Sequence, residues 1–430
     1  MPAPSKVIQP RHYETFRCTG ADCEDTCCDG WAITVDRLTY DKYQQCSDPE
    51  LGPLSQALVT IKSSDANDDE YASIKLTETH CPFLSEGLCA IQKKLGEDYL
   101  SNICAIYPRI INRVGDALER NLDLSCPEAA RIVLSDPHPM ELLETADQVG
   151  SFRMGAPRVP GVPHVSYDGK PYSHFLDVRS LIVAILRARA YPLWKRLVII
   201  GHLCDKLSEM AVMNNDEDIP AIIQGYSYAV NNGSFDTLLS KCQIQPSAQL
   251  VTVLELIVKR ITSDFTGRRF LDCYQDFMHG LQWKPESNLE NITRRYTDAY
   301  TKYYVPFFDQ NQYVMERYFI AYVYKNLFPL GRLEVNRKCG LDRVDNAISI
   351  QCMLMMAYYA IIRTVLIGMA SFHQSAFGMD HVIKAIQSGT KAFQHSSSYP
   401  ASAIEILTRN GLKNGASMAV LVQESDGAEA

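Results

Sequence analysis

The chain has 430 residues, of which 46% are hydrophobic and 21% charged, a composition that excludes disorder along the whole length. Its 42 basic and 50 acidic residues give a net charge of −8, which argues against a nucleic-acid partner because binding to phosphates requires a basic surface. A mean hydropathy of −0.14 argues against an integral membrane protein, and the length predicts two or three domains.

The N-terminal segment, residues 1–13, has no apolar stretch and no cleavage site of small residues. These features predict neither a signal peptide nor a membrane anchor. We therefore expect a cytoplasmic protein, with no membrane partner, whose thiols remain reduced.

Residues 1–135 are rich in cysteine and in turn-forming residues, and they predict a metal-cluster domain with little strand. A short strand is expected at 30–36, helices at 41–58 and 93–111, and an exposed acidic loop at 65–70. The predicted domain therefore has mixed structure, without long periodic elements.

A proline-rich segment, residues 136–174, predicts a connection between two bodies, because repeated prolines prevent a long helix. Residues 175–430 show apolar side chains at helical period and predict an all-helical C-terminal body. The fold class is therefore expected to be mainly α. The expected helical stretches are 176–186, 193–207, 247–265, 268–283, 288–305, 311–328, 343–372, 379–394 and 400–409.

One stretch, Ala347 to Ala370, is apolar enough to be considered as a membrane span. It carries Gln351 and Arg363 and stands inside a series of helices. We therefore expect a buried core helix.

Cysteines are concentrated at the N-terminal end, with nine of fourteen in the first 126 residues. In a reducing compartment, crowded cysteines indicate metal or redox chemistry more than disulfides. Thiolates are soft anionic donors that suit iron–sulfur clusters or zinc. The nine are Cys18, Cys23, Cys27, Cys28, Cys46, Cys81, Cys89, Cys104 and Cys126.

Cys46 stands outside the cysteine-rich blocks and is expected to be a buried thiol. Eight candidates then remain, which exceed one tetrahedral set, so some are spectators or a second site exists. The adjacent pair Cys27 and Cys28 raises the same question, because neighbours in regular structure rarely point at one metal.

Four sequence blocks resemble the flagellin lysine-N-methylase family and a broader group of zinc- or iron-chelating domains named for a CxxCxxCC pattern. They are Phe16 to Trp31, His80 to Ile91, Cys104 to Arg109 and Leu124 to Arg131. The order of the four blocks is specific, although each block alone is a weak signal.

This resemblance implies an iron–sulfur cluster, which we expect to be [4Fe-4S], with S-adenosylmethionine as methyl donor and flagellin as protein substrate. The implied activity is protein lysine N-methylation. Cysteines shared with the broader group map to Cys23, Cys27, Cys28, Cys81, Cys89 and Cys104, and the narrower pattern adds Cys18 and Cys126 as a second tier.

Two expected motifs are missing. A CxxxCxxC motif, typical of radical S-adenosylmethionine enzymes, would start at Cys23 and Cys27, but its third position is Gly30. The chain also has no strand–GxGxG–helix motif of the commonest methyltransferase fold. Because the CxxxCxxC motif is missing, we expect polar substitution by a neutral lysine amine rather than radical chemistry.

Trp31 and Arg109 lie inside the cysteine blocks and are candidates for contacting the methyl donor. Arg109 is expected either to bind the carboxylate of the methyl donor or to neutralise the negative charge of a cluster. The aromatic-rich segment 296–328 is either a packing face between helices or a path for lysine and sulfonium. No catalytic residue is assigned.

An alternative function is a non-catalytic iron-binding or redox-sensing interaction module, and a third is a structural zinc protein. Binding of S-adenosylmethionine distinguishes the methyltransferase from the iron-binding module, because only the enzyme requires this donor. The metal content of the purified protein distinguishes the structural zinc protein from the other two.

Overall fold

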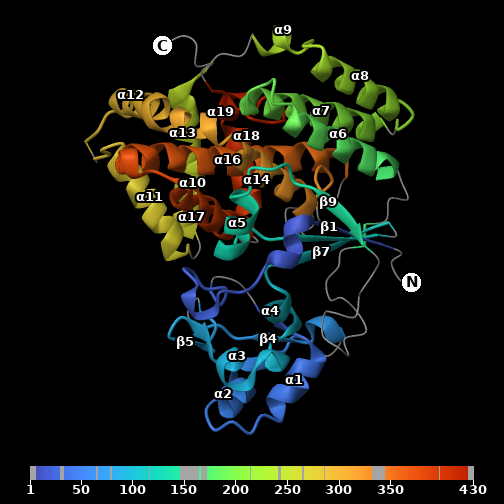
Figure 1. Ribbon diagram of the computed structural model, residues 1–430, viewed down its shortest axis with the longest axis vertical. Coiled ribbons are helices and arrows are strands. Elements are labelled where there is room, and N and C mark those ends of the chain that lie inside the picture. The colour runs from blue at the N-terminus through green and yellow to red at the C-terminus, as the bar shows by residue number, and fades with distance from the viewer. Residues whose placement is uncertain are drawn as a thin grey trace. The chain divides into compact units, whose positions relative to one another are not determined.

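The computed structural model comprises two compact units (Figure 1). We call Met1–Ile132, Glu141–His164 and Phe265–Gly267 the N-terminal unit. We call Val133–Met140, Val165–Asp264 and Arg268–Ala430 the helical unit. The described residues are 6–29, 33–63, 66–77, 80–115, 117–145, 164–165, 172–213, 215–240, 244–263, 266–284, 286–331, 344–396 and 398–424.

A five-stranded sheet with strand order β10-β7-β8-β1-β9 forms the scaffold of the N-terminal unit. Its strands are β1 (Lys6–Pro10), β7 (Arg109–Val114), β8 (Ala117–Leu122), β9 (Leu142–Thr145) and β10 (His164–Val165). β7 and β8 pair as an antiparallel hairpin, and β1 pairs in parallel with β8 and antiparallel with β9. The sequence predicted little strand here, so this sheet is a difference from the expectation. Strands of two to six residues are too short to show a clear alternation.

Smaller elements complete the N-terminal unit. A three-stranded sheet has the order β2-β4-β3, and β5 pairs with β6 as a hairpin. The elements are η1 (Arg11–Thr15), η2 (Gly20–Asp22), β2 (Thr34–Val35), α1 (Arg37–Gln44), α2 (Leu51–Leu58), β3 (Val59–Ile61), η3 (Asp68–Glu70), β4 (Ala72–Ile74), β5 (Leu84–Ser85), β6 (Leu88–Cys89), α3 (Ala90–Leu95), η4 (Glu97–Tyr99), α4 (Asn102–Ile106) and α5 (Pro127–Leu134).

Both helices predicted in this unit were too long. The 41–58 stretch divides into α1 and α2, and Asp36 caps α1 by accepting a hydrogen bond from the Thr39 N–H at 3.0 Å. The 93–111 stretch divides into α3, α4 and the start of β7. Gly96, with a φ of +86°, ends α3 because its conformation is unfavourable for other residues.

The helical unit confirms the prediction of a helical C-terminal body: apart from Val165, which ends β10, its described residues form no strand. Its helices are α6 (Phe175–Arg187), α7 (Leu193–Met213), α8 (Ile219–Asn231), α9 (Asp236–Leu239), α10 (Pro246–Ser263), α11 (Arg268–Gly280), α12 (Leu289–Ala299), α13 (Val305–Gln310), α14 (Gln312–Lys325), α16 (Val344–His373), α17 (Met379–Gly389), α18 (Tyr399–Arg409) and α19 (Ala419–Val422). Tyr172–His174 and Gln374–Ala376 are short 3-10 helices, and Tyr300–Tyr304 and Thr390–Gln394 are π-helical turns.

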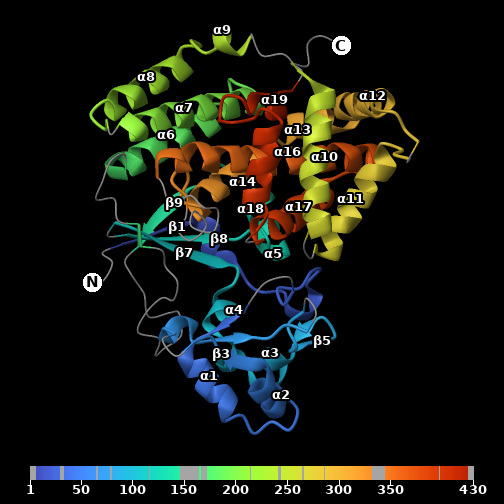
Figure 2. The same ribbon diagram turned by 180° about the vertical axis from the view of Figure 1, so that it is seen from behind.

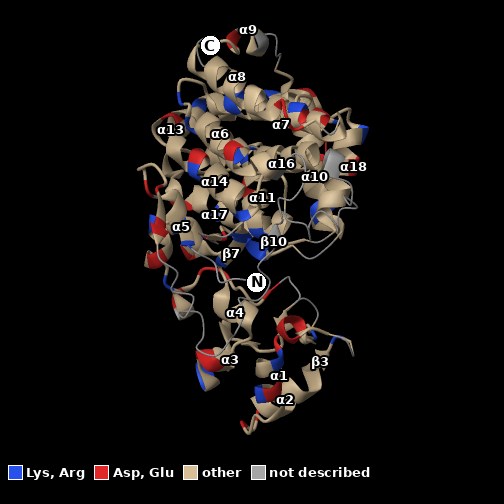
Figure 3. Cartoon of the chain, turned by 90° about the vertical axis from the view of Figure 1, so that its right-hand side faces the viewer, with Lys and Arg blue, Asp and Glu red and all other residues tan. Residues whose placement is uncertain are grey.

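α16 is the central helix of this unit and packs against α7, α10, α11 and α17 (Figures 1 and 2). By length and composition it is the one described helix that could cross a membrane, but its most apolar window is 100% buried. Gln351 and Arg363 are buried with it, and α16 shows almost no charged residue in Figure 3. The prediction of a buried core helix is therefore confirmed.

Glycines allow α11 and α16 to cross closely, which gives a testable prediction. A Cβ atom at Gly280 would lie 1.9 Å from the Gly368 carbonyl oxygen, so the helices would have to separate. We expect Gly280→Ala to lower the free energy of unfolding by about 1–3 kcal/mol or more, measured by urea denaturation. Gly225→Ala is the matched control, because Gly225 is exposed in α8 and a Cβ there meets nothing within 4 Å. Gly225→Ala should leave the free energy of unfolding unchanged or raise it by up to about 1 kcal/mol. Equal losses of stability in both variants would contradict the close crossing of α11 and α16.

Candidate functional site

A pocket of about 660 Å³ lies within the N-terminal unit. Its wall comes from the segment around η1 and η2, from the β6–α3 region, from α4, and from the strands β7 and β8. The cysteines in its lining are Cys18, Cys23, Cys27, Cys28, Cys89, Cys104 and Cys126. The pocket therefore collects thiols from all four cysteine-rich blocks of the sequence.

Five thiols form one interacting group, which we call the five-thiol set: Cys27, Cys28, Cys81, Cys89 and Cys104. Cys28 hydrogen-bonds to Cys27 and to Cys89, and the charges of Cys89 and Cys27 act on both Cys81 and Cys104. The backbone joins two of the blocks directly, because the Cys81 N–H donates to the Cys28 carbonyl at 2.9 Å. The set therefore unites residues that are up to 77 positions apart in the sequence.

Cys89 differs from Cys28, Cys81 and Cys104 in having a lowered pKa. A hydrogen bond from Cys28 lowers the pKa of Cys89, and the N–H groups of Gln92 and Ile91 act in the same direction. Cys89 precedes α3 as its N-cap, which explains why these N–H groups point toward its sulfur. Cys89 therefore ionises more readily than an ordinary cysteine, and the thiolate is the form that binds metals.

Three other thiols of the set, Cys28, Cys81 and Cys104, keep their protons more strongly. Hydrogen bonds with Cys27 and Cys89, together with burial, raise the pKa of Cys28. Burial also raises the pKa of Cys81 to about 11 and that of Cys104 to about 12. A metal that binds these sulfurs must displace their protons, so binding is expected to release protons and to strengthen as the pH rises.

A second group, which we call the three-thiol set, contains Cys18, Cys23 and Cys126. Burial raises the pKa of Cys126 to about 12, and the charges of Cys23 and Cys18 act in the same direction. Cys18 is exposed and accepts a hydrogen bond from the Gly20 N–H at 3.4 Å. The sequence grouped Cys23 with the first-tier candidates, whereas the structure places it beside the two second-tier residues.

The thiols are neighbours, but they do not form a preformed metal cage. In the part of the chain that the structure describes, no group of three or more His, Cys, Asp or Glu side chains is arranged to hold a metal ion. Trp31, the other predicted donor contact, lies outside the described residues. Cys46 is partly buried against the apolar core of the unit and does not line the pocket.

Two arginines lie at the pocket lining together with aromatic rings. The Arg109 guanidinium lies 5.0 Å from the centre of the Phe16 ring, and that of Arg120 lies 6.0 Å from the centre of the Tyr13 ring. The sequence indicated Arg109 because it belongs to a cysteine block. It gave no signal for Tyr13 or Arg120, which lie outside the blocks.

The aromatic-rich segment 296–328 belongs to the helical unit. The rings of Tyr300 and Tyr304 stack with centroids 5.6 Å apart, and those of Tyr304 and Phe308 stack at 4.3 Å. Tyr318 and Phe319 are almost completely buried. These contacts favour the packing interpretation of the segment over a path for lysine.

Comparison with known proteins decides the family. The model of the FliB lysine N-methylase C-terminal domain matches residues 179–421, which is more than half of the chain. The chain belongs to the FliB lysine N-methylase family. Apart from Phe265–Gly267, the matched region lies in the helical unit, whereas the thiols that line the pocket belong to the N-terminal unit.

Similar curated proteins come from Salmonella. The lysine-N-methylases of Salmonella typhimurium and Salmonella choleraesuis are 35% identical over 141 residues, covering 32% of this chain and 35% of each relative. The flagellar biosynthetic protein FliU of Salmonella muenchen is 35% identical over 141 residues, which cover 82% of its length. The match thus spans about a third of the two lysine-N-methylases, and no solved structure matches.

Proposed function

We propose that this protein is an S-adenosylmethionine-dependent lysine N-methyltransferase that acts on flagellin in the cytoplasm, before flagellin is exported. The observation that carries the proposal is the match of a lysine N-methylase domain to residues 179–421. The name of the FliU relative, a flagellar biosynthetic protein, supports a flagellar substrate.

The pocket of the N-terminal unit is the proposed site of the methyl donor. Its volume of about 660 Å³ lies in the range of about 300–1,000 Å³ that is usual for small-molecule sites. Aromatic and apolar side chains such as Phe16 and Leu88 share its wall with the charged side chain of Arg109. This mixture suits a ligand that carries both a flat heterocycle and a charged amino-acid group.

The five-thiol set is the proposed site of a [4Fe-4S] cluster. Its sulfurs fit in chemistry, because iron–sulfur clusters are bound by cysteine thiolates, and four of the five would suffice. Cys81, Cys89 and Cys104 would then bind together with either Cys27 or Cys28, which are adjacent in sequence. When bound, the cluster would supply redox-active iron at the wall of the pocket, which four of these thiols line.

In the proposed reaction, the neutral lysine amine attacks the donor methyl group, and the new N–C bond forms as the S–C bond breaks. The products are methyl-lysine and S-adenosylhomocysteine. Asp25, Glu97 and Asp98 line the pocket and offer carboxylates that attract the lysine ammonium. The ammonium must lose its proton before attack, and alignment of the amine with the methyl carbon contributes the rest of the rate increase.

Iron binding without catalysis is the competing function, because the five-thiol set requires no methyl donor in order to bind metal. The two functions differ in whether the intact, metal-loaded chain binds S-adenosylmethionine. An anaerobic binding titration therefore distinguishes them before any activity is measured.

The direct test incubates anaerobically purified protein with S-adenosylmethionine and unmethylated flagellin. We expect lysine peptides to gain the mass of one or more methyl groups, with one S-adenosylhomocysteine formed for each methyl group. Flagellin with acetylated lysines is the control and should gain none. If the chain neither binds S-adenosylmethionine nor transfers a methyl group, the result favours the iron-binding function. Formation of 5′-deoxyadenosine that depends on a strong reductant would overturn the polar mechanism but not the enzyme class.

A further inference from the structure

One end of the pocket in the N-terminal unit carries a group of hydrogen-bond donors, formed by Tyr13, Arg109 and Arg120, which we call the arginine end. We propose that the arginine end binds the carboxylate of a small-molecule ligand. The identification of that carboxylate as the amino-acid end of the methyl donor rests on the proposed function. The carboxylate site itself rests on the geometry described below.

The β7–β8 hairpin places both arginines on one face of the sheet. Ile111 pairs with Arg120, and Arg109 pairs with Leu122. Alternate residues of a strand share a face, and directly paired residues lie on the same face. Arg109 and Arg120 are therefore diagonal neighbours across the hairpin, and both line the pocket.

Tyr13 supplies the observation that points to a missing ligand. Its side chain is only 4% exposed and lines the pocket, yet its hydroxyl is buried without a hydrogen-bond partner. Burial raises the pKa of Tyr13 far above its ordinary value, so the hydroxyl remains neutral and able to donate a hydrogen bond. A buried unpaired hydroxyl is unfavourable, and a bound acceptor would remove this penalty.

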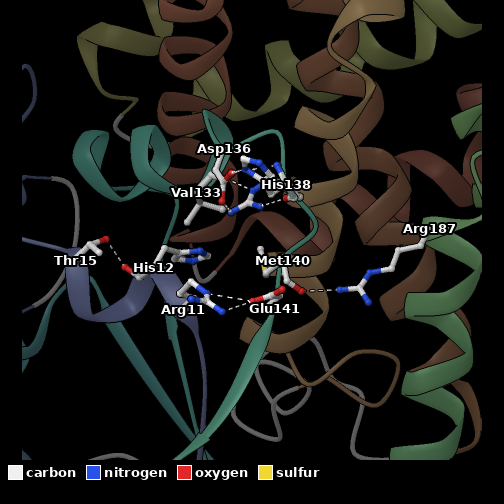
Figure 4. A network of polar contacts seen from close by, with 10 residues as sticks. Arg11, His12, Thr15, Val133, Asp136, His138, Met140, Glu141 and Arg187 are labelled. Carbon is white, nitrogen blue, oxygen red and sulfur yellow. Dashed lines mark hydrogen bonds and ion pairs between the residues drawn. The ribbon is translucent and has the colours of Figure 1, made fainter.

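The backbone that carries Tyr13 is held in place within the same unit (Figure 4). The Thr15 hydroxyl donates to the His12 carbonyl at 2.7 Å across the 3-10 helix η1. Arg11, at the start of η1, forms an ion pair with Glu141 at 2.6 Å. Tyr13 is thus presented by a short, fixed turn.

Arg120 is also fixed before a ligand arrives. It is only 8% exposed, and its Nη1 donates to the Gln9 side-chain oxygen at 3.3 Å. The Gln9 amide in turn donates to Glu14 at 2.7 Å. Ordered donors bind more tightly than mobile ones because less conformational entropy is lost on binding.

A carboxylate is the ligand group that fits these donors. Two guanidinium groups and a phenol hydroxyl offer N–H and O–H donors, and a carboxylate accepts from several donors at once. The rings of Phe16 and Tyr13 lie against the two guanidinium groups. Guanidinium donors lie in the plane of the group, so the Phe16 ring over the face of Arg109 does not block them.

The experiment compares two ligands by anaerobic calorimetry on the full chain: S-adenosylhomocysteine and its decarboxylated analogue, which keeps the amine. We expect Tyr13→Phe to weaken S-adenosylhomocysteine binding about tenfold or more and to leave the analogue unchanged, because a hydrogen bond to a charged group is lost. Arg109→Gln should show the same selectivity. Tyr191→Phe is the matched control, because Tyr191 is a buried tyrosine of the helical unit that does not line the pocket.

Stability separates a ligand-binding role from a structural one. Tyr13→Phe breaks no hydrogen bond in the free protein, so its unfolding midpoint should not fall. Equal weakening of both ligands, or no weakening, would overturn the carboxylate site. If S-adenosylhomocysteine does not bind but L-methionine does, in a Tyr13-dependent manner, the site stands and the donor assignment fails. If neither ligand shows Tyr13-dependent binding, the carboxylate site is refuted.

Discussion

Serine at Cys81, Cys89 or Cys104 is expected to remove nearly all iron from anaerobically purified protein. The three residues come from two different sequence blocks and belong to the five-thiol set around Cys89. A serine hydroxyl keeps its proton at neutral pH and is a poor ligand for iron–sulfur clusters. Because only one of the adjacent Cys27 and Cys28 is expected to bind, one replacement leaves three thiolate ligands in place of four. Iron and acid-labile sulfide per chain are the quantities to measure.

Cys46→Ser is the matched control for these variants. Cys46 belongs to the same unit and is partly buried, but it lies outside the pocket lining. Its replacement should leave the iron content unchanged. Serine at Cys18 or Cys126 tests the three-thiol set, and we expect a smaller loss there. Stoichiometric zinc without iron, or equal losses at Cys46 and Cys89, would contradict the proposed ligands.

Replacing Arg363 by methionine is expected to lower the free energy of unfolding by about 3–5 kcal/mol. The Arg363 guanidinium is almost completely buried and donates to the Leu421 carbonyl at 2.7 Å and the Val422 carbonyl at 2.6 Å. It also pairs with the Glu424 carboxylate at 3.2 Å. Methionine would leave these acceptors at the end of α19 without their donor. Urea denaturation of the full chain measures the loss.

Arg409→Met provides the comparison for that variant. Arg409 pairs with Glu255, but its side chain is 57% exposed. Exposed ion pairs contribute little, so we expect a change below about 1 kcal/mol. If Arg363→Met lowered the free energy of unfolding equally little, the hydrogen bonds of the Arg363 guanidinium would not stabilise α19 as proposed.

The helical unit could be predicted because its signal is long and repeated. The stretch 247–265 closely matches α10, and the stretch 343–372 matches α16. The sequence analysis missed α8, Ile219–Asn231, although Ile219, Ile222 and Ile223 recur at helical spacing, because Pro220 and Gly225 interrupt the pattern. Periodicity is therefore clearest in long helices and weaker in a short helix that proline and glycine interrupt.

The site was predictable only in part, for a similar reason. Crowded cysteines are visible in a sequence, so the thiols of the pocket could be named before the structure was known. Which thiols interact depends on contacts between distant blocks, such as the hydrogen bond between Cys28 and Cys89. The arginine end depends on the register of β7 against β8 and on the Tyr13 hydroxyl, which has no hydrogen-bond partner. Neither feature can be recognised from a local sequence motif.

The position of β1 in its sheet sets the order in which the N-terminal unit can be completed during synthesis. Val7 pairs with Leu118 on one side and with Thr145 on the other, so both partners are made more than a hundred residues later. At about 5–20 residues per second, the ribosome needs on the order of ten seconds to reach them. All the cysteines of this region are translated within that interval, before β9 exists. The thiols of the proposed cluster site are therefore all synthesised before the sheet can be completed.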